Sequence, residues 1–536
     1  MIPKSDRKGT PSVPSSTIFC FWGKEGSISL KHPASARYFQ DNVTDFAVNG
    51  FPVVPLSALR ALVIVLPLLS ACAVQPLPPG LPQEALALPD QFSASGDAIP
   101  DQRWWRSFRD PQLDALVQQA LTGSPDLKAA LWRLEQAAAV ARGARSGFWP
   151  QVSGELEHTE QRRSQDSGFD FSGGENEGGS WSGRLAASYE IDLWGRVRSS
   201  ARAAEAARLA SEESLQVAAL SLASEVATTW LQLREQWGQR DLLHQQLDIN
   251  RKTLRVLELR FGGGISAAAD VLQQRSLVVQ SQQELTETEF NIEALKVQLA
   301  TLVGTTTEVL NGMVEPRTGL PMLPALPNTG VPAHLLLRRP DVLEAQRNLL
   351  EGYYLAEQAW AERLPVISLA AFYSGGGPSI SDITKDWLLT LTAAAEGVIF
   401  DGGRLSSERK RQEAAEQERW AQLESTVLSA LSEVERALIQ EQAVRERLRY
   451  LRERAQLSDL IVVRQRRAYT RGTVDFLNVL TATNEQQSLE RQMLAAQREL
   501  IENRVVLYRA LSGGIPGEDL PDAQPLELER YRQGGS

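Results

Sequence analysis

The amino-acid sequence predicts a mixed fold that is mainly α-helical, with a smaller set of β-strands of the kind that cross a membrane. It also predicts that this arrangement is built twice in one chain. Three observations lead to the prediction. Short motifs recur at fixed offsets, two long stretches are nearly free of glycine and proline, and two segments alternate apolar and polar residues with a period of two.

The internal duplication is visible in paired motifs. Pro125-Asp126 and Pro340-Asp341 are 215 positions apart, and so are Pro150 and Pro365. Further along the chain the offset becomes 208, so the seven-residue difference falls in a loop. The motifs at this second offset are Gly195-Arg196 with Gly403-Arg404, Glu205-Ala206-Ala207 with Glu413-Ala414-Ala415, Gly264 with Gly472, and Val271-Leu272 with Val479-Leu480. Four matches at one offset indicate two structurally equivalent halves.

Each half is expected to hold a helix, a strand hairpin, a long helix and a second helix, in that order. The first repeat is expected over 125–304 and the second over 340–512, with a linking segment at 305–339 and a C-terminal tail at 513–536. The elements of the first repeat are a helix over 127–148, a hairpin over about 151–194, and helices over 196–260 and 266–303. Those of the second repeat are a helix over 342–364, a hairpin over about 366–400, and helices over 404–471 and 473–511.

The hairpins carry the period of two. Residues Trp181 to Leu193 place apolar side chains on one face and polar ones on the other, and Ile367 to Phe400 repeats the pattern less regularly. The strand lengths suit membrane strands of about 9 to 11 residues. The glycine- and serine-rich stretches 161–180 and 374–385 are expected to be exposed loops. Four strands cannot close a barrel alone, so several chains must contribute. Periodicity alone equally allows a soluble sheet with its apolar face on a core.

The long helices are predicted because two long stretches lack proline and almost entirely lack glycine. Residues 196–260 contain no proline and one glycine, and 404–471 contain neither, so each could form a helix of about 100 Å. One apolar stripe runs through Leu423, Val427, Leu431, Val434 and Leu438. Gly262-Gly263-Gly264 with Ser266, and Gly472 with Thr473, are expected to end the long helices and cap the shorter ones of roughly 60 Å.

A lipoprotein signal is predicted at residues 56–71. The apolar run 61–69 is half the length that a spanning helix needs, it follows Arg60, and it ends in Leu69-Ser70-Ala71-Cys72. Cys72 would then be the lipid-bearing mature N-terminus, and this export signal favours the membrane interpretation of the hairpins. A chance cysteine behind a buried segment is the alternative. Residues 1–55 resemble no exported n-region, which suggests a non-native extension and a start at Val53, Val54 or Leu56.

Residues 72–124 are expected to form a tether followed by the first globular elements. Pro76 to Ala98 is rich in proline, leucine and small residues and reads as extended chain. Trp104-Trp105 and Phe108 begin the globular part, and Leu113 to Leu121 suits a short amphipathic helix.

Composition excludes several functional classes. The chain carries 56 Lys and Arg against 66 Asp and Glu, a net charge of −10, which argues against a nucleic-acid partner. Cys20 lies ahead of the signal, so the mature chain keeps only Cys72 and no disulfide is expected. Its three histidines, His158, His244 and His334, are widely separated, and there is no phosphate loop or metal motif. We therefore expect no enzyme activity, cofactor or metal site.

Together these features resemble the outer-membrane efflux family of TolC and OprM. The resemblance rests on the lipobox, the tandem halves, the hairpin before each long helix, and the turns Arg260-Phe261-Gly262-Gly263-Gly264 and Tyr469-Thr470-Arg471-Gly472. It covers about residues 72–514 and is strongest to the lipid-anchored branch. That branch is similar around Trp104-Trp105, in Tyr189-Glu190-Ile191-Asp192-Leu193-Trp194-Gly195-Arg196 and in Leu507-Tyr508-Arg509-Ala510-Leu511.

The resemblance implies a homotrimer in which three chains form a 12-stranded β-barrel in the outer membrane, continued by a long α-helical periplasmic tunnel. A periplasmic adaptor and an inner-membrane pump, of RND type, would deliver drugs or other small molecules to this exit duct. Two alternatives stay open: a TolC-like exit duct for protein secretion, and a periplasmic adaptor lipoprotein. An adaptor has one helical hairpin with β-domains, whereas this chain has two halves that each carry membrane-type strands.

The resemblance also implies functional residues at the periplasmic end of the tunnel. The family places acidic rings there, but the matching positions here are Asn478 and Thr481, so Asp475 and Asp270 are left as candidate gate acids. Asp475 could instead be an acid favoured by a helix N-terminus. The turns are expected to contact the adaptor through Arg260, Gly264, Arg471 and Gly472.

Overall fold

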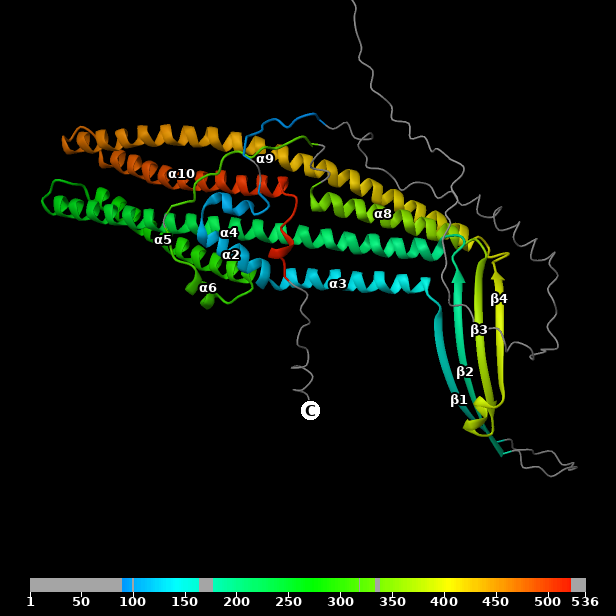
Figure 1. Ribbon diagram of the computed structural model, residues 1–536. Coiled ribbons are helices and arrows are strands. Elements are labelled where there is room, and N and C mark those ends of the chain that lie inside the picture. Colours follow the sequence, from blue (N-terminus) through cyan, green and yellow to red (C-terminus); the bar gives the residue numbers. More distant parts are fainter. Residues whose placement is uncertain (1–88, 99–100, 163–176, 318, 333–337, 522–536) are drawn as a thin grey trace, which may run out of the picture. The chain divides into compact units, whose positions relative to one another are not determined.

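A computed structural model describes residues 89–98, 101–162, 177–317, 319–332 and 338–521. The expectations for the extension 1–55, the signal peptide 56–71 and the lipid-bearing Cys72 lie outside these residues. Every element described below belongs to the unit Gln75–Ser536. Figure 1 traces its helices and its one antiparallel sheet of four strands, which lie side by side in the order β1-β2-β3-β4.

The two repeats contain the same series of elements. The long helices α4 and α9 have 67 residues each, and the helices that follow them, α5 and α10, have 36 each. The predicted mainly helical, duplicated fold is confirmed. In the first repeat the bounds are α3 Pro125–Arg145, β1 Gln151–Arg162, β2 Glu177–Ile191, α4 Arg196–Gly262 and α5 Ala268–Val303. In the second they are α8 Pro340–Ala361, β3 Val366–Gly377, β4 Trp387–Glu396, α9 Arg404–Thr470 and α10 Phe476–Leu511.

The four helices next to the strands pack side by side in the same order as the strands that they adjoin. Contacts join α3 to α4, α4 to α8, and α8 to α9, and these helices lead into or out of β1, β2, β3 and β4 respectively (Figure 1). Farther along the long helices, α5 packs on α4 while α10 packs on both α9 and α4. The two repeats therefore share one continuous layer of strands and one continuous set of helices.

The sheet has one apolar and one polar face because paired residues in neighbouring strands point the same way. Leu185 of β2 faces Gly154 of β1 and Tyr373 of β3, and Tyr373 faces Leu389 of β4. On the opposite face Arg184 lies between Glu155 and Ser374. The period of two that the sequence predicted for residues 181–191 is thus the alternation of two faces.

The hairpin of the second repeat differs from the sequence-based expectation. Residues 374–377 belong to β3 rather than to a loop, and a short 3-10 helix, η3 (Ile380–Thr384), fills most of the connection to β4. β4 ends at Glu396, so Val398, Ile399 and Phe400 lie beyond the strand and are exposed. Because these three residues are apolar, the sequence pattern predicted a strand that continues to Phe400.

An aromatic core lies beside the first repeat, around the 3-10 helix η1 (Trp104–Phe108) and helix α2 (Pro111–Gly123). Trp104 is fully buried and stacks on Tyr508 of α10, with ring centroids 6.2 Å apart. Asp110 caps α2 and also accepts hydrogen bonds from Trp230 and Arg234 at 2.9 and 2.8 Å. This buried carboxylate ties the segment before the first repeat to α4.

A carboxylate starts each long helix. Gly195 and Gly403 precede α4 and α9 with φ of 81° and 92°, a region that favours glycine. Asp192 accepts from the backbone N–H groups of Val197 and Arg198, and Asp401 accepts from those of Gly403 and Leu405. Hydrogen bonds from the Leu405 and Gly403 N–H groups lower the pKa of Asp401. Both helices therefore begin with unpaired N–H groups satisfied by an acid.

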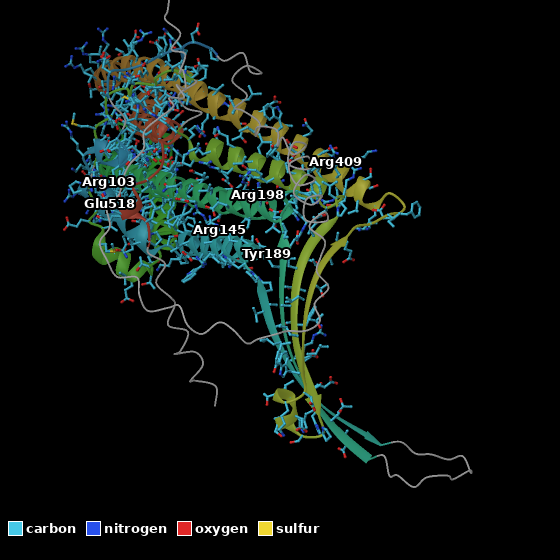
Figure 2. The ribbon with its side chains drawn as sticks, turned by 45° about the vertical axis from the view of Figure 1, so that its right-hand side comes forward. Arg103, Arg145, Tyr189, Arg198, Arg409 and Glu518 are labelled. Carbon is cyan, nitrogen blue, oxygen red and sulfur yellow. The ribbon has the colours of Figure 1, made fainter. Side chains whose placement is uncertain are left out.

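The linking segment and the C-terminal end pack on the helices. Helix α6 (Thr307–Met313) lies against α5. Arg504 is fully buried, binds Glu441 through two nitrogens and donates to the Pro324 carbonyl. At the start of the expected C-terminal tail, Ile515 is buried and η4 (Gly517–Asp519) is bound by Arg103, which lies near Glu518 in Figure 2. Among the described helices, none is both long and apolar enough to cross a bilayer.

Candidate functional site

Two interhelical turns form the candidate site, one in each repeat. We call residues 257–271 and 467–481 together the tip. In the first turn the Gly264 N–H donates to the Phe261 carbonyl, and the Ile265 N–H reaches back to the Arg260 carbonyl at 2.8 Å. Gly264 has φ of 75°, which a side chain would strain.

The second turn repeats this pattern 208 residues later. The Gly472 N–H donates to Tyr469, the Thr473 N–H donates to Ala468, and Gly472 has φ of 72°. The predicted caps Ser266 and Thr473 are wrong, because the N-cap residues of α5 and α10 are Ala267 and Asp475. The Thr473 hydroxyl instead donates back to the Ala468 carbonyl at the end of α9.

The two turns contact each other through Tyr469. Its hydroxyl lies 3.0 Å from the Ser266 hydroxyl, and the Arg260 guanidinium stacks over its ring at 4.9 Å. The ring also meets Phe476 edge-on, with centroids 5.4 Å apart. Leu257, Phe476 and Val479 form a buried cluster beneath. The tip is therefore a packed junction of α4, α9 and α10.

The candidate gate residues of α10 share one exposed face. Asp475 precedes the helix, Asn478 follows by one turn and Thr481 by another, and all three are exposed. The Asp475 carboxylate accepts no capping hydrogen bond from α10. Asp270 lies apart from them, half-buried in the first turn of α5. The structure thus groups three of the four candidate gate residues.

The candidate contact residues occupy both turns. Gly264, Arg471 and Gly472 are exposed, and a β-carbon at Gly264 or Gly472 would meet no atom within 4 Å. Arg260 is half-buried by its stacking on Tyr469. Three of these residues are therefore open to a partner, whereas Arg260 holds the two turns together.

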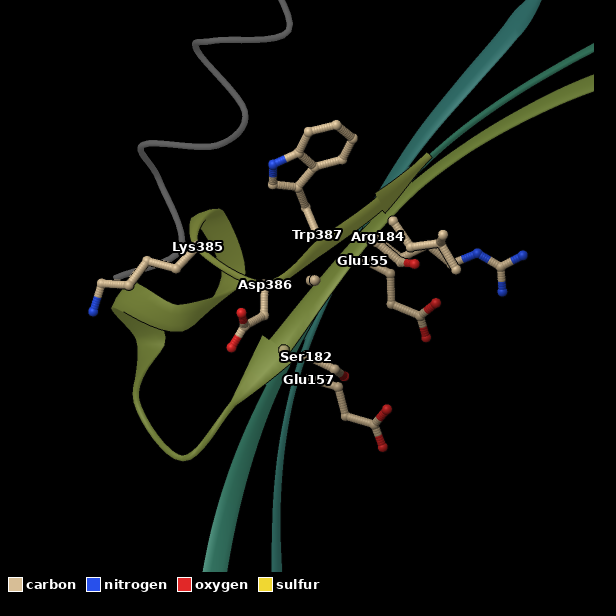
Figure 3. A pocket seen from close by; sticks show the side chains of 12 residues that line it. Glu155, Glu157, Ser182, Arg184, Lys385, Asp386 and Trp387 are labelled. Atoms are coloured by element: carbon tan, nitrogen blue, oxygen red, sulfur yellow. The ribbon is translucent and has the colours of Figure 1, made fainter. Parts of the chain in front are cut away.

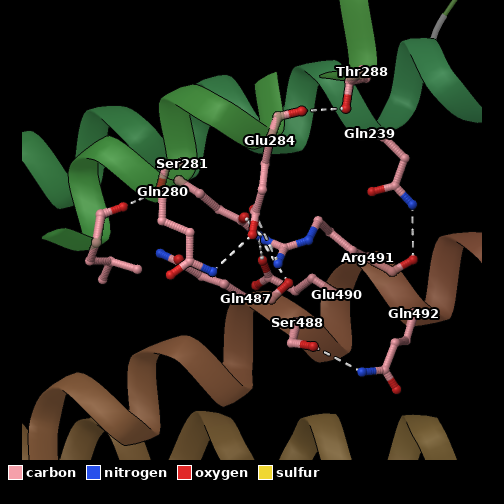
Figure 4. Close-up of polar contacts among 12 residues, drawn as sticks. Gln239, Gln280, Ser281, Glu284, Thr288, Gln487, Ser488, Glu490, Arg491 and Gln492 are labelled. Atoms are coloured by element: carbon pink, nitrogen blue, oxygen red, sulfur yellow. Dashed lines mark hydrogen bonds and ion pairs between the residues drawn. The ribbon is translucent and has the colours of Figure 1, made fainter. Parts of the chain in front are cut away.

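A buried amide pair joins the repeats just behind the tip, and Figure 4 shows its α10 member, Gln487, among polar neighbours. Asn250 of α4 is 1% exposed, and its side chain both donates to and accepts from Gln487 of α10, at 3.3 and 3.1 Å. Asn250 also donates to the Ser281 hydroxyl, while Gln274 donates to the Asn250 carbonyl. Sequence reasoning missed this pair because its members are 237 positions apart and share no local pattern.

The amide network continues away from the tip. Gln246 donates to Glu490 at 2.8 Å and accepts from Arg491 at 2.7 Å, and Arg491 pairs with Glu284 of α5. Buried polar groups are costly unless every member finds a partner. The network therefore fixes α10 of the second repeat in one register against α4 and α5 of the first.

The sheet is the second functional surface. Its apolar face carries exposed Leu156, Leu185 and Leu391, and stacked aromatic pairs near the β1–β2 and β3–β4 loops, His158 with Trp181 and Tyr373 with Trp387. An apolar band with aromatic residues at its margin is the surface that membrane strands present to lipid.

A polar hollow lies on the other face, near the same loops. Glu155, Glu157 and Arg184 project from one side of the sheet in Figure 3, together with Ser182. Ser374 also lines the hollow, and Arg184 stacks on Phe372 at 4.5 Å. Such charged side chains suit contact with water. Among the described residues there is no cluster of three or more His, Cys, Asp or Glu that could hold a metal ion.

Comparison with known proteins assigns the fold to a family. The model of the outer membrane efflux protein family matches residues 116–305 and 331–513, which are the two repeats. The chain belongs to the outer membrane efflux protein family. It is 31% identical over 463 residues to the pyoverdine export outer membrane protein OpmQ of Pseudomonas aeruginosa, covering 83% of this chain and 95% of that protein.

Two further relatives support the assignment. The toluene efflux pump outer membrane protein TtgF of Pseudomonas putida is 27% identical over 432 residues, which are 80% of this chain and 88% of that one. The solved outer-membrane channel OprN superposes with a TM-score of 0.73 at 27% identity, covering 82% of this chain and 99% of that one. The protein is therefore an outer-membrane channel of an efflux system, and channels of this family are trimeric parts of such systems.

Proposed function

We propose that three copies of this chain close a 12-stranded barrel in the outer membrane. The sheet supports this because β1 and β4 are its two edges, each with one unpaired side, and edges cannot face lipid. Pairing β4 of one copy with β1 of the next removes every edge. The apolar face then meets lipid, and the face with Glu155 and Arg184 lines the lumen.

Two helices, α5 and α9, carry exposed apolar surfaces that fit the same assembly. α5 exposes an apolar stripe that repeats at helical spacings, and α9, which contacts only α8 and α10 among the more extensive helix contacts, exposes another. Laying α5 of one copy along α9 of the next would bury both stripes. The stripe of α5 is Leu272, Val279, Phe290 and Val297, and that of α9 is Leu428, Ile439, Tyr450, Leu457 and Leu460.

The assembly is tested in mild detergent. Light scattering should give a trimer that resists dissociation, and Phe290→Glu should weaken it by placing a charge in the seam. Gln280→Glu is the matched control, because Gln280 is exposed on α5 outside the stripe. A wild-type monomer that keeps its β-signal would contradict the assembly.

We further propose that the trimer is the exit duct of a tripartite pump for drugs or other small molecules. The pair of matching, exposed glycine turns at the tip supports this proposal. In each copy, a periplasmic adaptor could contact the backbone of both turns in the same way. The adaptor would connect the duct to an inner-membrane pump of RND type. OpmQ and TtgF are named for pyoverdine export and toluene efflux, so related ducts serve unlike cargo.

The duct proposal is tested by complementation. A Gram-negative strain without its own outer-membrane efflux channels should regain resistance to small toxic compounds when it receives this chain with its cognate pump and adaptor. Rescue of protein secretion alone would favour the TolC-like secretion duct. Function without trimer formation would favour the adaptor lipoprotein, which the paired hairpins argue against.

We also propose that the mature chain begins at a lipid-modified Cys72. The sequence Leu69-Ser70-Ala71-Cys72 supports this, and acyl chains on one cysteine would anchor the chain stably. Palmitate labelling should mark the wild-type chain, and Cys72→Ala should abolish both label and cleavage. An unlabelled wild-type chain would remove the lipoprotein proposal while leaving the channel intact.

A further inference from the structure

The end of α9 carries a concentrated positive charge in an acidic protein. Residues 460–474 contain four arginines, Arg464, Arg466, Arg467 and Arg471, and no Asp or Glu, although the whole chain has a net charge of −10. All four side chains are exposed. We call these four residues the arginine cluster.

The cluster differs from several other arginines of the same helix. In the middle of α9, Arg445, Arg449 and Arg454 pair with Glu441, Glu446 and Glu485. Within the part of the chain that the structure describes, no side chain of the arginine cluster makes an ion pair or hydrogen bond. Its charge is therefore uncompensated and available to a mobile ion.

The first repeat does not share the cluster. The positions 208 residues earlier are Val256, Glu258, Leu259 and Gly263, and Val256 and Leu259 are exposed apolar residues. The equivalent residues 252–266 hold Lys252, Arg255 and Arg260 against Glu258, a net charge of +2 rather than +4, and Lys252 is paired with Asp248. Duplication of the fold therefore does not account for the cluster.

Stabilisation of the end of α9 explains only two of the four arginines in the cluster. Cations within the last turn of a helix are stabilised by the helix dipole, and this effect fades beyond that turn. Arg467 and Arg471 lie in or next to the last turn of α9, but Arg464 and Arg466 lie farther back. Half of the arginine cluster thus has no such explanation.

The neighbouring start of α10 adds almost no negative charge. Residues 476–484 contain no acid, and the exposed positions Asn478 and Thr481 are neutral. Asp475 is the single acid between residues 460 and 484, so it opposes four arginines. In a trimer these charges would be repeated three times around one opening.

We propose that the periplasmic mouth of this duct favours anionic over cationic solutes, and that its cargo is drawn from organic anions. The proposal rests on the proposed function, in which the tip surrounds the entrance. Charges act over about 8–10 Å at physiological salt, so the arginine cluster need not touch the solute. A mouth of one sign raises the local concentration of counter-ions by about 10-fold or more.

Ion selectivity in planar bilayers tests this without pump or adaptor. The reversal potential across a KCl gradient should show preference for chloride in the wild-type trimer. Replacing all four residues of the arginine cluster by glutamine should lower the chloride-to-potassium permeability ratio by about threefold or more. Replacing chloride by p-toluenesulfonate and potassium by tetraethylammonium extends the measurement to organic ions.

Arg452→Gln is the matched control. Arg452 is exposed on the same helix, unpaired among the described residues, and about 18 Å from Arg464 along the axis. The Arg452→Gln variant should leave the chloride-to-potassium permeability ratio unchanged.

A cation-selective wild type, or a four-arginine variant with wild-type selectivity, would overturn the proposal. Lost export with unchanged selectivity would assign the cluster to an acidic partner protein instead. A wild type that forms no channels would contradict the duct itself.

Discussion

The hydroxyl groups of Ser266 and Tyr469 lie 3.0 Å apart, so one hydrogen bond joins the interhelical turn of the first repeat to that of the second. The same tyrosine ring holds Arg260 on its face and Phe476 at its edge. Any separation of the two turns at the tip must break this bond and slide the guanidinium off the ring.

Tyr469→Phe should therefore loosen the tip without unfolding it. The variant loses the hydrogen bond, worth about 1 kcal/mol, but keeps the aromatic contacts. We expect a higher single-channel conductance and an unchanged trimer. Ser266→Ala should produce the same change, and the double variant should add nothing to either. Fully additive effects would mean that the two hydroxyls act separately.

Asn250→Ala should destabilise the helical body by about 1–3 kcal/mol, because it leaves the buried Gln487 amide without its partner. Thermal unfolding of the trimer followed by circular dichroism measures the loss. Gln422→Ala is the control, since Gln422 is exposed and, among the described residues, its side chain bonds only to Glu418 on its own helix. Equal melting temperatures for the two variants would show that the amide network does not hold the repeats together.

Gly472→Trp should reduce export while the trimer remains abundant, because the indole would fill space that an adaptor backbone approaches. Gly472→Ala provides the comparison. Both variants bear the strain of φ at 72°, but only tryptophan is bulky. Drug susceptibility and trimer abundance are measured together. Equal loss of export in both variants would trace the defect to backbone strain rather than to docking.

Divalent cations should block the pore weakly, since Asn478 and Thr481 offer no carboxylate ring and Asp475 is the only acid between residues 460 and 484. Asp475→Asn should remove the residual block in single-channel recordings. Strong block that survives this substitution would place the gate elsewhere.

Glu433→Gln should lower stability at neutral pH and have less effect in acid. Burial opposes ionisation of Glu433, but hydrogen bonds and charge from Arg509 and Arg339 hold its pKa below the usual value. Its stabilising effect is present above the unfolded pKa of about 4.3 and is lost as the pH falls through the folded pKa. Melting temperatures of the variant and wild type should converge as the pH falls below the unfolded pKa and through the lower folded pKa. A constant difference would exclude ionisation as the cause.

Much of the fold follows from local patterns in the sequence. The paired motifs predicted two repeats because duplication preserves spacing, and the alternation around Leu185 predicted the strands because the pleat has a period of two. The ends of elements were less predictable. Ser266 and Thr473 have the chemistry of caps, but the turn geometry of Gly264 and Gly472 moves the helix starts past them.

The contacts within the tip could not be predicted from sequence patterns. The turns themselves were predicted from their glycines, but the bond between Ser266 and Tyr469 depends on how distant helices pack. The pairing of Asn250 with Gln487 has the same origin. The charge of the arginine cluster is plain in the sequence, but its lack of partners is visible only when the neighbouring helices are in place.

The pairing of β2 with β3 inside one chain has a consequence for how the ring forms. Three chains supply six repeats, and a closed ring of six has six joints. Three of those joints are made within a chain, where their formation does not depend on protein concentration. Assembly then needs only two encounters between molecules, because the third joint between chains closes within the trimer, whereas six separate repeats would need five encounters. Gene duplication therefore more than halves the number of assembly steps whose rate depends on protein concentration.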